Sequence, residues 1–400
     1  MTRPALLFYC QHSVGMGHLM RSLALLRALT TRFDVTLVSG GALPPFAETH
    51  GARVVALPPV GLDEHGALVS RDHRRRLDRA LDIRRRMLLD AYRASRPRAV
   101  IVELFPFGRR KFAAELEPML QAARAGAHAA RPVVCCSLRD ILVSRDKQAK
   151  HDDKSMQLLH AYFDAVLVHS DPAFATLEES LAPGVRVPVP VHHTGFVHGS
   201  GAARPARRRT PRSSIVVSAG GGLVGEPLLS ASIEAQALIP ARLRRPLALV
   251  AGPFLPEDGW RRLRRLAASA PDVTMRHAVP DLAHELRHAA ASVSQCGYNT
   301  AMDLLESRVP ALVVPYGEAN EDEQLKRARR LEALGALRVL PVAEMTPPRL
   351  AVEITSLAAF TPTVSRLNLH GADRTADLLE TMLDHDAPAV TAAMPLERIA

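Results

Sequence analysis

Two blocks of alternating strand and helix patterns constrain the fold of this chain more than any other feature. The first block has short apolar runs at 5–10, 35–39, 54–57, 100–104, 133–137 and 165–169, separated by helical patterns such as 18–31. The second block has apolar runs at 215–218, 247–251, 273–277, 291–294 and 311–314, with helical patterns at 227–238, 260–268, 282–289, 299–306, 323–334 and 347–359. Short apolar runs between amphipathic helices indicate parallel sheets covered on both faces. We therefore predict an α/β fold with two doubly wound parallel-sheet domains.

A stretch rich in Arg and Pro separates the two blocks. It covers residues 201–213 and has no apolar periodicity, which is typical of a linker. This places an N-terminal domain at 1–200 and a C-terminal domain at 214–360. Residues 361–400 form a C-terminal helix and tail that could pack back on the N-terminal domain. Ligands of doubly wound sheets bind beyond the carboxyl ends of the strands, so we expect the site in the cleft between the domains.

The positive charge of the chain is local. The formal net charge is +10, and the segment Arg71–Arg86 alone holds eight Arg against three Asp. Such a segment suits an anionic membrane surface or an acidic substrate, whereas the alternative is a solvated helix face. Only 4% of the residues are aromatic and no nucleic-acid-reading motif is present, so we do not expect nucleic acid as a partner. The oligomeric state stays open.

Cysteine spacing and hydropathy point to the cytoplasm. The four cysteines show neither metal-site nor disulfide-framework spacing, and no secretory leader is recognisable. The apolar runs are much shorter than the roughly 20 residues that span a bilayer. We expect a cytoplasmic protein, with peripheral contact to the inner face of the plasma membrane through Arg71–Arg86 as a hypothesis.

Glycine turns follow the first strand of each block. Gly15-Met16-Gly17-His18 precedes the first helix, and Gly220-Gly221-Gly222 follows the strand at 215–218. Glycines permit tight turns and close backbone approach, and a helix start adds positive partial charge. A dinucleotide fingerprint would need a third glycine where Met20 stands, so no nicotinamide or flavin cofactor is expected. The alternative for either turn is a plain flexible loop.

The segment from Ser294 to Gln324 carries the richest set of binding groups. A Gly-Tyr-Asn-Thr turn opens a helix, an acid follows one turn inside it, and a polar loop ends at Gln324 after a buried strand. The N–H groups at a helix start bind anions, and a carboxylate one turn further on can take ribose hydroxyls. Together these groups predict a pocket for a phosphorylated nucleoside.

These motifs, in this order, resemble the GT-B glycosyltransferases, which have two facing Rossmann-like domains with an interdomain cleft. Gly-Met-Gly-His at 15–18, the glycines at 220–222 and Gln-Cys-Gly-Tyr-Asn-Thr at 295–300 are most similar to one branch of that superfamily. The branch contains the N-acetylglucosaminyltransferase of the peptidoglycan lipid precursor, with a family 28-like C-terminal domain, and the UDP-glycosyltransferases. The resemblance implies inverting, metal-independent transfer of a hexose or N-acetylhexosamine from a UDP-sugar. The UDP-sugar is a co-substrate, no cofactor is implied, and the acceptor would be a hydroxyl of a lipid-linked or small molecule.

Carried over residue by residue, the resemblance also implies which groups hold the donor. Gln295 stands where plant enzymes place a diphosphate-contacting His, Asp303 or Glu306 would take the ribose, and Glu323 with Gln324 would read sugar hydroxyls. The full donor set is Gly15, Gly17, Gly220, Gly221, Gly222, Gln295, Gly297, Asn299, Thr300, Asp303, Glu323 and Gln324.

Transfer to a hydroxyl also needs a base, because the acceptor must lose a proton as it attacks. His18 is the candidate catalytic base and Glu103 its rival, while the alternative for His18 is a helix-capping role. No metal site is expected, because the lone acidic pair Asp152-Asp153 is typical of a solvated helix face.

The acceptor is expected to meet the N-terminal domain. Phe105 and Arg109 lie in a loop that follows a strand, and Arg139 at another strand end could meet a phosphate. The alternatives are a core-capping Phe105 and a surface pair between Arg139 and Asp140. A helix around 71–91 carries an apolar side interrupted only by Arg84.

Two other function classes remain at this stage. A non-hydrolysing UDP-sugar 2-epimerase would share the architecture, although its usual catalytic acids and arginines are not recognisable here. A non-catalytic nucleotide-sugar-binding protein would use the same pocket without turnover. The sequence does not specify the sugar, the nucleotide, the acceptor or its pathway.

Overall fold

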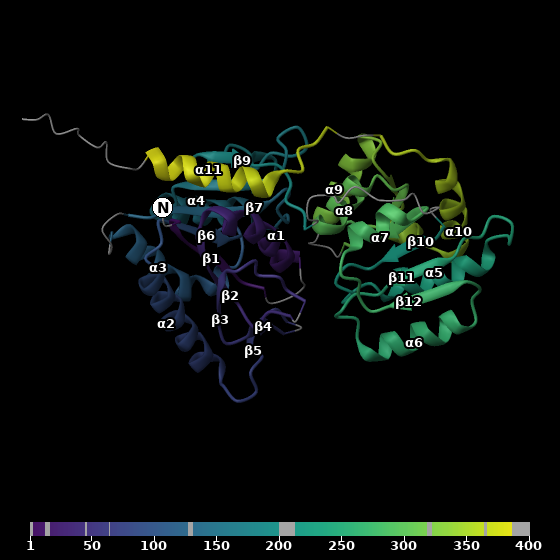
Figure 1. Cartoon of the computed structure of the whole chain (residues 1–400), viewed down its shortest axis with the longest axis horizontal. Helices are drawn as coiled ribbons and strands as arrows, with labels where there is room; N and C mark the ends of the chain where they lie inside the picture. Colours follow the sequence, from purple (N-terminus) through teal and green to yellow (C-terminus); the bar gives the residue numbers. More distant parts are fainter. Residues whose placement is uncertain are drawn as a thin grey trace, which may run out of the picture.

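The computed structural model describes residues 3–12, 17–44, 46–63, 65–126, 131–199, 213–317, 322–363 and 366–385. Two α/β units lie side by side along the longest axis (Figure 1). Gly15 and residues 201–212 of the predicted linker lie outside the described residues.

The N-terminal unit is built on a parallel sheet. Within the described residues its strand order is β3-β2-β1-β6-β7-β8-β9. The strands are β1 Ala5–Cys10, β2 Asp34–Ser39, β3 Arg53–Ala56, β6 Ala99–Glu103, β7 Val133–Arg139, β8 Ala165–His169 and β9 Val191–His193. A small antiparallel pair consists of β4 Val60–Leu62 and β5 Leu68–Ser70. The helices are α1 Gly17–Arg32, α2 Leu77–Ser95, α3 Ala113–Arg124 and α4 Gln148–Tyr162.

The C-terminal unit repeats this plan with the strand order β12-β11-β10-β13-β14-β15. Its strands are β10 Ile215–Ser218, β11 Leu247–Val250, β12 Val273–Arg276, β13 Ala291–Ser294, β14 Ala311–Val313 and β15 Arg338–Val339. Its helices are α5 Glu226–Leu238, α6 Glu257–Ala268, α7 Leu282–His288, α8 Tyr298–Ser307, α9 Glu323–Ala333 and α10 Pro347–Ser356. Short 3-10 helices span Arg110–Phe112, Glu178–Ser180, Val342–Glu344 and Leu357–Ala359. The predicted fold class is confirmed.

Strand β1 illustrates why the buried strands are continuous apolar runs. Leu6 and Phe8 belong to the core on the α1 side of the sheet, whereas Leu7 and Tyr9 belong to the core on the side of α2 and α3. Successive side chains of a strand point to opposite faces, so a sheet covered by helices on both sides needs apolar residues at every position.

Both sheets reverse their strand order at one point, between β1 and β6 and between β10 and β13. Loops at such a switch point diverge to opposite faces and leave a crevice at the carboxyl edge. The chain places the His18 turn and Glu103 at the first switch point. It places the glycines at 220–222 and the Gln295 turn at the second.

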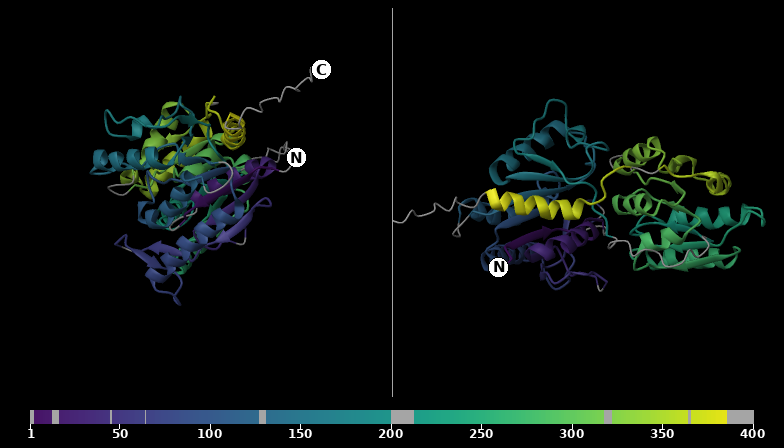
Figure 2. Two further views of the ribbon diagram at one scale, coloured as in Figure 1. Left: turned by 90° about the vertical axis from the view of Figure 1, so that its left-hand side faces the viewer. Right: turned by 45° about the horizontal axis from the view of Figure 1, so that its top comes forward.

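The last helix, α11 Gly371–His385, returns to the N-terminal unit and lies along it (Figure 2). Ala376 and Leu379 belong to the same core cluster as residues of α1. Arg32 at the end of α1 forms an ion pair with Glu380 at 2.6 Å. The C-terminal segment therefore connects the two units a second time.

Helix α2 differs from the prediction at its start. It begins at Leu77 rather than at Arg71, because Asp72 accepts a hydrogen bond from the Arg74 N–H at 3.0 Å and fixes a turn before the helix. Arg84, the interruption in the apolar side of the helix, is fully buried. Its guanidinium donates to the Glu115 carboxylate at 2.6 Å, so its charge is paired inside the domain.

The prediction of a solvated acidic pair at 152–153 is wrong for Asp152. This residue is fully buried and accepts hydrogen bonds from Gln148 Nε2 and the Ala182 N–H, both at 2.8 Å. Asp153 is exposed as expected. Asp152 therefore fixes the loop after the Glu178–Ser180 turn, a role that helical spacing alone does not reveal.

Candidate active site

A histidine and a carboxylate meet at the switch point of the N-terminal sheet. His18 lies in the first turn of α1, and Glu103 is the last residue of β6, the strand beside β1. The distance from His18 Nδ1 to Glu103 Oε1 is 2.6 Å, and the Glu103 side chain is fully buried. Because the carboxylate accepts this bond, Nδ1 carries the hydrogen and Nε2 is left as a proton acceptor. The two residues considered as rival bases thus form one pair.

Burial is the main reason why the imidazole of His18 is neutral. Burial lowers the pKa of His18 to about 4, against the opposing influence of Glu103. Burial alone would raise the pKa of Glu103, but the charges of His18, Arg21 and Arg109 outweigh it and hold that pKa at about 2. Arg21 also forms a buried ion pair with Glu103. At neutral pH the site therefore holds a neutral histidine beside a carboxylate.

The donor motif predicted at 295–300 forms the start of α8. Gly297 is the N-cap residue in an extended conformation, and no side chain caps the helix. The N–H groups of Cys296 and Tyr316 donate to Gln324 Oε1 at 3.0 and 3.2 Å. Gln324 thus joins the loops that follow β13 and β14, and the first turn of α8 is available to an anion.

The glycine turn after β10 packs against the turn after β11, backbone to backbone. Gly222 has φ of 90°, and a Cβ atom there would come 2.5 Å from the Ala251 carbonyl oxygen. A Cβ atom on Gly252 would come 2.4 Å from the carbonyl carbon of Gly221. Only glycine satisfies both the left-handed backbone and this close approach.

Two acids of α8 were candidates for the ribose, and they differ in their surroundings. Glu306 is bound to Arg287 at 3.0 Å. Asp303 has no hydrogen-bond or ion-pair partner among the described residues. Burial, together with the charges of Asp281 and Glu306, raises its pKa well above the usual range. Asp303 is therefore the acid left for a ligand.

Tyr298, which no sequence argument singled out, joins the two units. Its hydroxyl donates to the His169 carbonyl at 3.0 Å and accepts from the Val197 N–H at 2.8 Å, both in the N-terminal unit. The guanidinium groups of Arg21 and Arg327 lie over its ring, 5.4 and 5.8 Å from the ring centroid. The sequence feature that could have identified Tyr298 is its place as an aromatic residue at the first helical position of the predicted donor motif.

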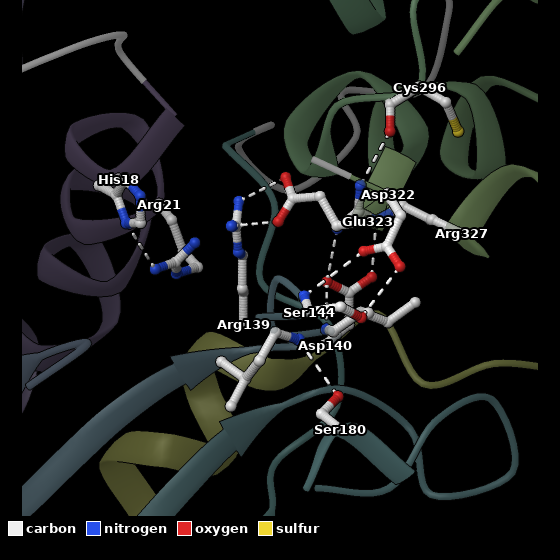
Figure 3. A network of polar contacts seen from close by, with 12 residues as sticks. His18, Arg21, Arg139, Asp140, Ser144, Ser180, Cys296, Asp322, Glu323 and Arg327 are labelled. Carbon is white, nitrogen blue, oxygen red and sulfur yellow. Dashed lines mark hydrogen bonds and ion pairs between the residues drawn. The ribbon is translucent and has the colours of Figure 1, made fainter. Parts of the chain in front are cut away.

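One face of α9 docks on the end of β7. Arg327 and Asp140 are both fully buried, and their Nε to Oδ2 distance is 2.6 Å (Figure 3). Arg327 also donates to the Cys296 carbonyl at 2.9 Å. The loop that opens the donor motif is thus tied through one guanidinium to the N-terminal sheet.

Beside this pair, Arg139 reaches across to Glu323. Their side chains form an ion pair with Nη1 to Oε1 at 2.8 Å, and Ser144 donates to Asp322 at 2.9 Å (Figure 3). The alternative of a surface pair between Arg139 and Asp140 is wrong, because each residue has a partner in the other unit. Arg139 lies near His18, and its charge adds to the lowering of that pKa.

The remaining predicted residues divide into two groups. Asn299 Nδ2 donates to the Gly17 carbonyl at 3.2 Å, so the starts of α1 and α8 face each other. Phe105, by contrast, is fully buried in the core, with its ring centroid 6.3 Å from that of Phe163. It cannot line an acceptor surface, because its side chain belongs to the buried core of the N-terminal unit. Gln295, Thr300, Gly220 and Gly221 lie in the donor-side turns described above.

Within the described residues, no group of three or more His, Cys, Asp or Glu is arranged to hold a metal ion. In that same part of the chain, no helix is both long and apolar enough to cross a bilayer.

Comparison with solved structures defines the class of fold. The calicheamicin glycosyltransferase CalG4 aligns over 97% of this chain and 100% of its own, with a TM-score of 0.59 and 19% identity. MurG of Acinetobacter baumannii covers 95% of this chain and 100% of its own, with a TM-score of 0.57 and 16% identity. The chain has the GT-B architecture of these glycosyltransferases.

The sequence is more specific about the C-terminal unit. Residues 265–373 match the glycosyltransferase family 28 C-terminal domain. The UDP-N-acetylglucosamine--N-acetylmuramyl-(pentapeptide) pyrophosphoryl-undecaprenol N-acetylglucosamine transferase of Alkalilimnicola ehrlichii is 30% identical over 187 residues, 46% of either chain. The enzyme of the same name from Pseudomonas fluorescens is 30% identical over 171 residues, 41% of this chain and 47% of its own. This chain thus matches about half the length of these relatives, and the predicted resemblance is confirmed.

Proposed function

We propose that this protein is an inverting glycosyltransferase that moves a hexose or N-acetylhexosamine from a UDP-sugar to an acceptor hydroxyl. The observation that carries the proposal is the His18–Glu103 pair, which faces a family 28 donor domain across the interface of the two units. A neutral imidazole oriented by a buried carboxylate is the arrangement that general-base catalysis requires.

The proposed reaction is a single displacement. The acceptor oxygen attacks the anomeric carbon, the bond from that carbon to the UDP oxygen breaks, and the hydroxyl proton moves to His18 Nε2. The resulting imidazolium is stabilised by Glu103, which accepts the Nδ1–H bond. One displacement inverts the anomeric centre, so an α-linked donor gives a β-linked product.

On the donor side, the uncapped start of α8 and the glycine turn after β10 would face the diphosphate. Their N–H dipoles can stabilise the charge that develops on the leaving group, and metal-independent transfer stays part of the proposal. Asp303 would bind the ribose hydroxyls. Glu323 would accept from sugar hydroxyls, since a carboxylate has about four acceptor positions and Arg139 occupies two of them.

The proposal includes a lipid-linked or small-molecule acceptor and a place at the cytoplasmic face of the membrane. The curated relatives act on a pyrophosphoryl-undecaprenol acceptor, as their name states. Parts of the basic segment are already neutralised, because Arg85 and Arg86 both pair with Asp82. Its remaining exposed arginines, such as Arg74, are the groups that would contact an anionic surface.

A thermal-shift and turnover experiment tests the proposal. Ligands that bind only the folded state raise the melting temperature by mass action, so UDP and UDP-sugars should raise it in the wild type. With a panel of lipid and small-molecule alcohols as acceptors, UDP should appear only when an acceptor is present, with and without EDTA. An altered sugar formed without acceptor would indicate an epimerase, and binding without turnover would indicate a binding protein. Absence of any nucleotide-dependent shift would refute the proposal.

A further inference from the structure

An open pocket of about 630 Å³ lies in the N-terminal unit, and every residue that lines it belongs to that unit. It sits at the carboxyl ends of β1, β2 and β3, beside α2. Its apolar lining includes Pro59, Val60, Ile83 and Met87. The volume falls within the range of about 300–1,000 Å³ that is usual for small-molecule sites. No sequence motif pointed to this pocket.

The buried Arg84 is hydrogen-bonded to the backbone of two loops that form the walls of the pocket. Its Nη1 atom donates to the carbonyl oxygens of Gly40 at 3.1 Å and Pro58 at 2.8 Å, which belong to the two loops that line the pocket. Glu115 balances the charge of Arg84, and both residues are buried. A buried network of this kind fixes the loops in place, so the pocket is preformed rather than created by a ligand.

The mouth of the pocket carries positive charge. Arg71 is exposed, its Nη2 atom donates to the Leu62 carbonyl at 2.6 Å, and it has no carboxylate partner among the described residues. Arg75, also at the mouth, pairs with Asp72. Among the residues that the structure describes, no acidic one lines the pocket. A group with negative charge would therefore find, within the described part of the chain, one guanidinium without a carboxylate partner beside an apolar wall.

One end of the pocket is lined by a residue of the same strand-to-helix connection that leads to His18. His12 lines the pocket and follows β1, six positions before His18. The pKa of His12 is lowered by burial and by the charges of Arg109 and Arg84, and Arg109 acts on His18 in the same way. The β4–β5 hairpin, whose Val60 lines the pocket, is also connected to the chain after Glu103, because Lys111 Nζ donates to the Gly66 carbonyl. The pocket is thus joined to the loop that follows Glu103.

We propose that this pocket binds an amphiphilic anion, with its apolar body against Pro59, Val60 and Met87 and a carboxylate or phosphate on Arg71. That this ligand is the acceptor of sugar transfer rests on the proposed function. The binding itself rests only on the apolar lining, the preformed walls and the cation at the mouth, Arg71, which has no carboxylate partner within the described ranges.

Calorimetric titration of the full chain with monomeric decyl phosphate tests the pocket. Decyl glucoside carries the apolar chain without the charge, and inorganic phosphate carries the charge without the chain. Both should bind at least about tenfold more weakly than decyl phosphate. R71E should weaken decyl phosphate binding by about tenfold or more, and the milder R71Q should weaken it in the same direction. Unchanged circular dichroism melts would show that both variants are folded.

R76E is the matched control. The substitution makes the same charge change as R71E, but the Arg76 side chain is 91% exposed and does not line the pocket. It should change the affinity by no more than about twofold in moderate salt. If R71E and R76E lost decyl phosphate affinity equally, the binding would be due to general charge attraction and not to the pocket. Tight binding of inorganic phosphate, or of phosphatidylglycerol vesicles but not of decyl phosphate, would also overturn the proposal.

The two proposals fail separately. If the wild type binds decyl phosphate but shows no thermal shift with any nucleotide, the proposed function is wrong and the pocket proposal stands. If the wild type binds UDP-sugar and releases UDP on transfer, but its decyl phosphate affinity does not depend on Arg71, the proposed function stands and the pocket proposal is wrong.

Discussion

Asp140 and Arg327 form a fully buried ion pair that joins the two units, with Nε and Oδ2 only 2.6 Å apart. The same guanidinium donates to the Cys296 carbonyl, at the start of the donor motif. A contact of this kind couples the position of the donor loop to the arrangement of the two sheets. Burial would lower the pKa of Arg327, but the charge of Asp140 more than offsets this and raises it.

Removing one partner of this pair should destabilise the protein. Asp140→Ala leaves Arg327 charged and buried, which should lower the free energy of unfolding by roughly 3–5 kcal/mol. Trp260, the single tryptophan of the chain, reports on the C-terminal unit in urea titrations, and circular dichroism reports on both. Arg329→Ala on the same helix removes a half-exposed ion pair with Glu332 and should change the free energy by less than about 1 kcal/mol. Similar effects of the two substitutions would contradict the role of Asp140.

His18 gives a prediction about the pH dependence of the proposed reaction. The neutral imidazole is the active form, and a pKa lowered to about 4 keeps it neutral well below pH 6.5. We expect kcat/KM to stay level from pH 7 to about 5.5 and to fall only as the pH approaches that pKa. Stability should also decrease as pH falls from about 6.5 toward 4, because the unfolded state binds a proton that the folded state rejects.

Substitution of His18 checks the same assignment. His18→Ala should reduce kcat by about 10² to 10⁴, the range typical for a general base. His160→Ala, at an exposed position on α4, should leave kcat unchanged. An acidic limb centred near pH 6.5, or a fully active His18→Ala variant, would show that another group takes the proton.

Asp303 and Glu306 should differ in their effect on nucleotide affinity. Asp303→Asn removes the carboxyl group that we propose for the ribose hydroxyls, so UDP affinity should fall by about ten- to a hundredfold. Pyrophosphate, which lacks a ribose, should bind both proteins equally. Glu306→Gln should have a smaller effect on UDP, because Glu306 is already held by Arg287. Titration calorimetry of both variants with both ligands decides between the two acids.

Arg139 should affect the sugar and not the nucleotide. Arg139→Gln leaves the mostly buried Glu323 carboxylate without its ion-pair partner, so Glu323 is no longer held where we propose that it binds the sugar. We expect the KM for the UDP-sugar to rise by about tenfold while the Kd of UDP stays constant. A parallel loss of UDP affinity would instead place Arg139 on the diphosphate, whereas the sequence suggested Arg139 as a residue that binds the acceptor.

The sequence predicted the two sheets, most of their strands and the donor motif because these depend on local patterns, whereas the short strands β9 and β15 were not predicted. Apolar runs of strand length and helical periodicity are set by which residues must be buried on a two-sided sheet. Glycine turns and the Gly-Tyr-Asn-Thr helix start are equally local, since they depend on backbone freedom and on free N–H groups. Helix α2 began later than predicted because a single Asp72 side chain competes for the backbone of its first turn.

Pairing between distant residues was decided only by the tertiary structure. Residues 18 and 103, 84 and 115, and 140 and 327 carry no mutual signal in the sequence, and each becomes a pair only when the strands or units meet. In the sequence, charged residues at such positions cannot be distinguished from charged residues on a solvated surface, as the prediction for Asp152 illustrates. Once water is excluded, however, a buried charge persists only beside a partner, and that partner is chosen by the fold.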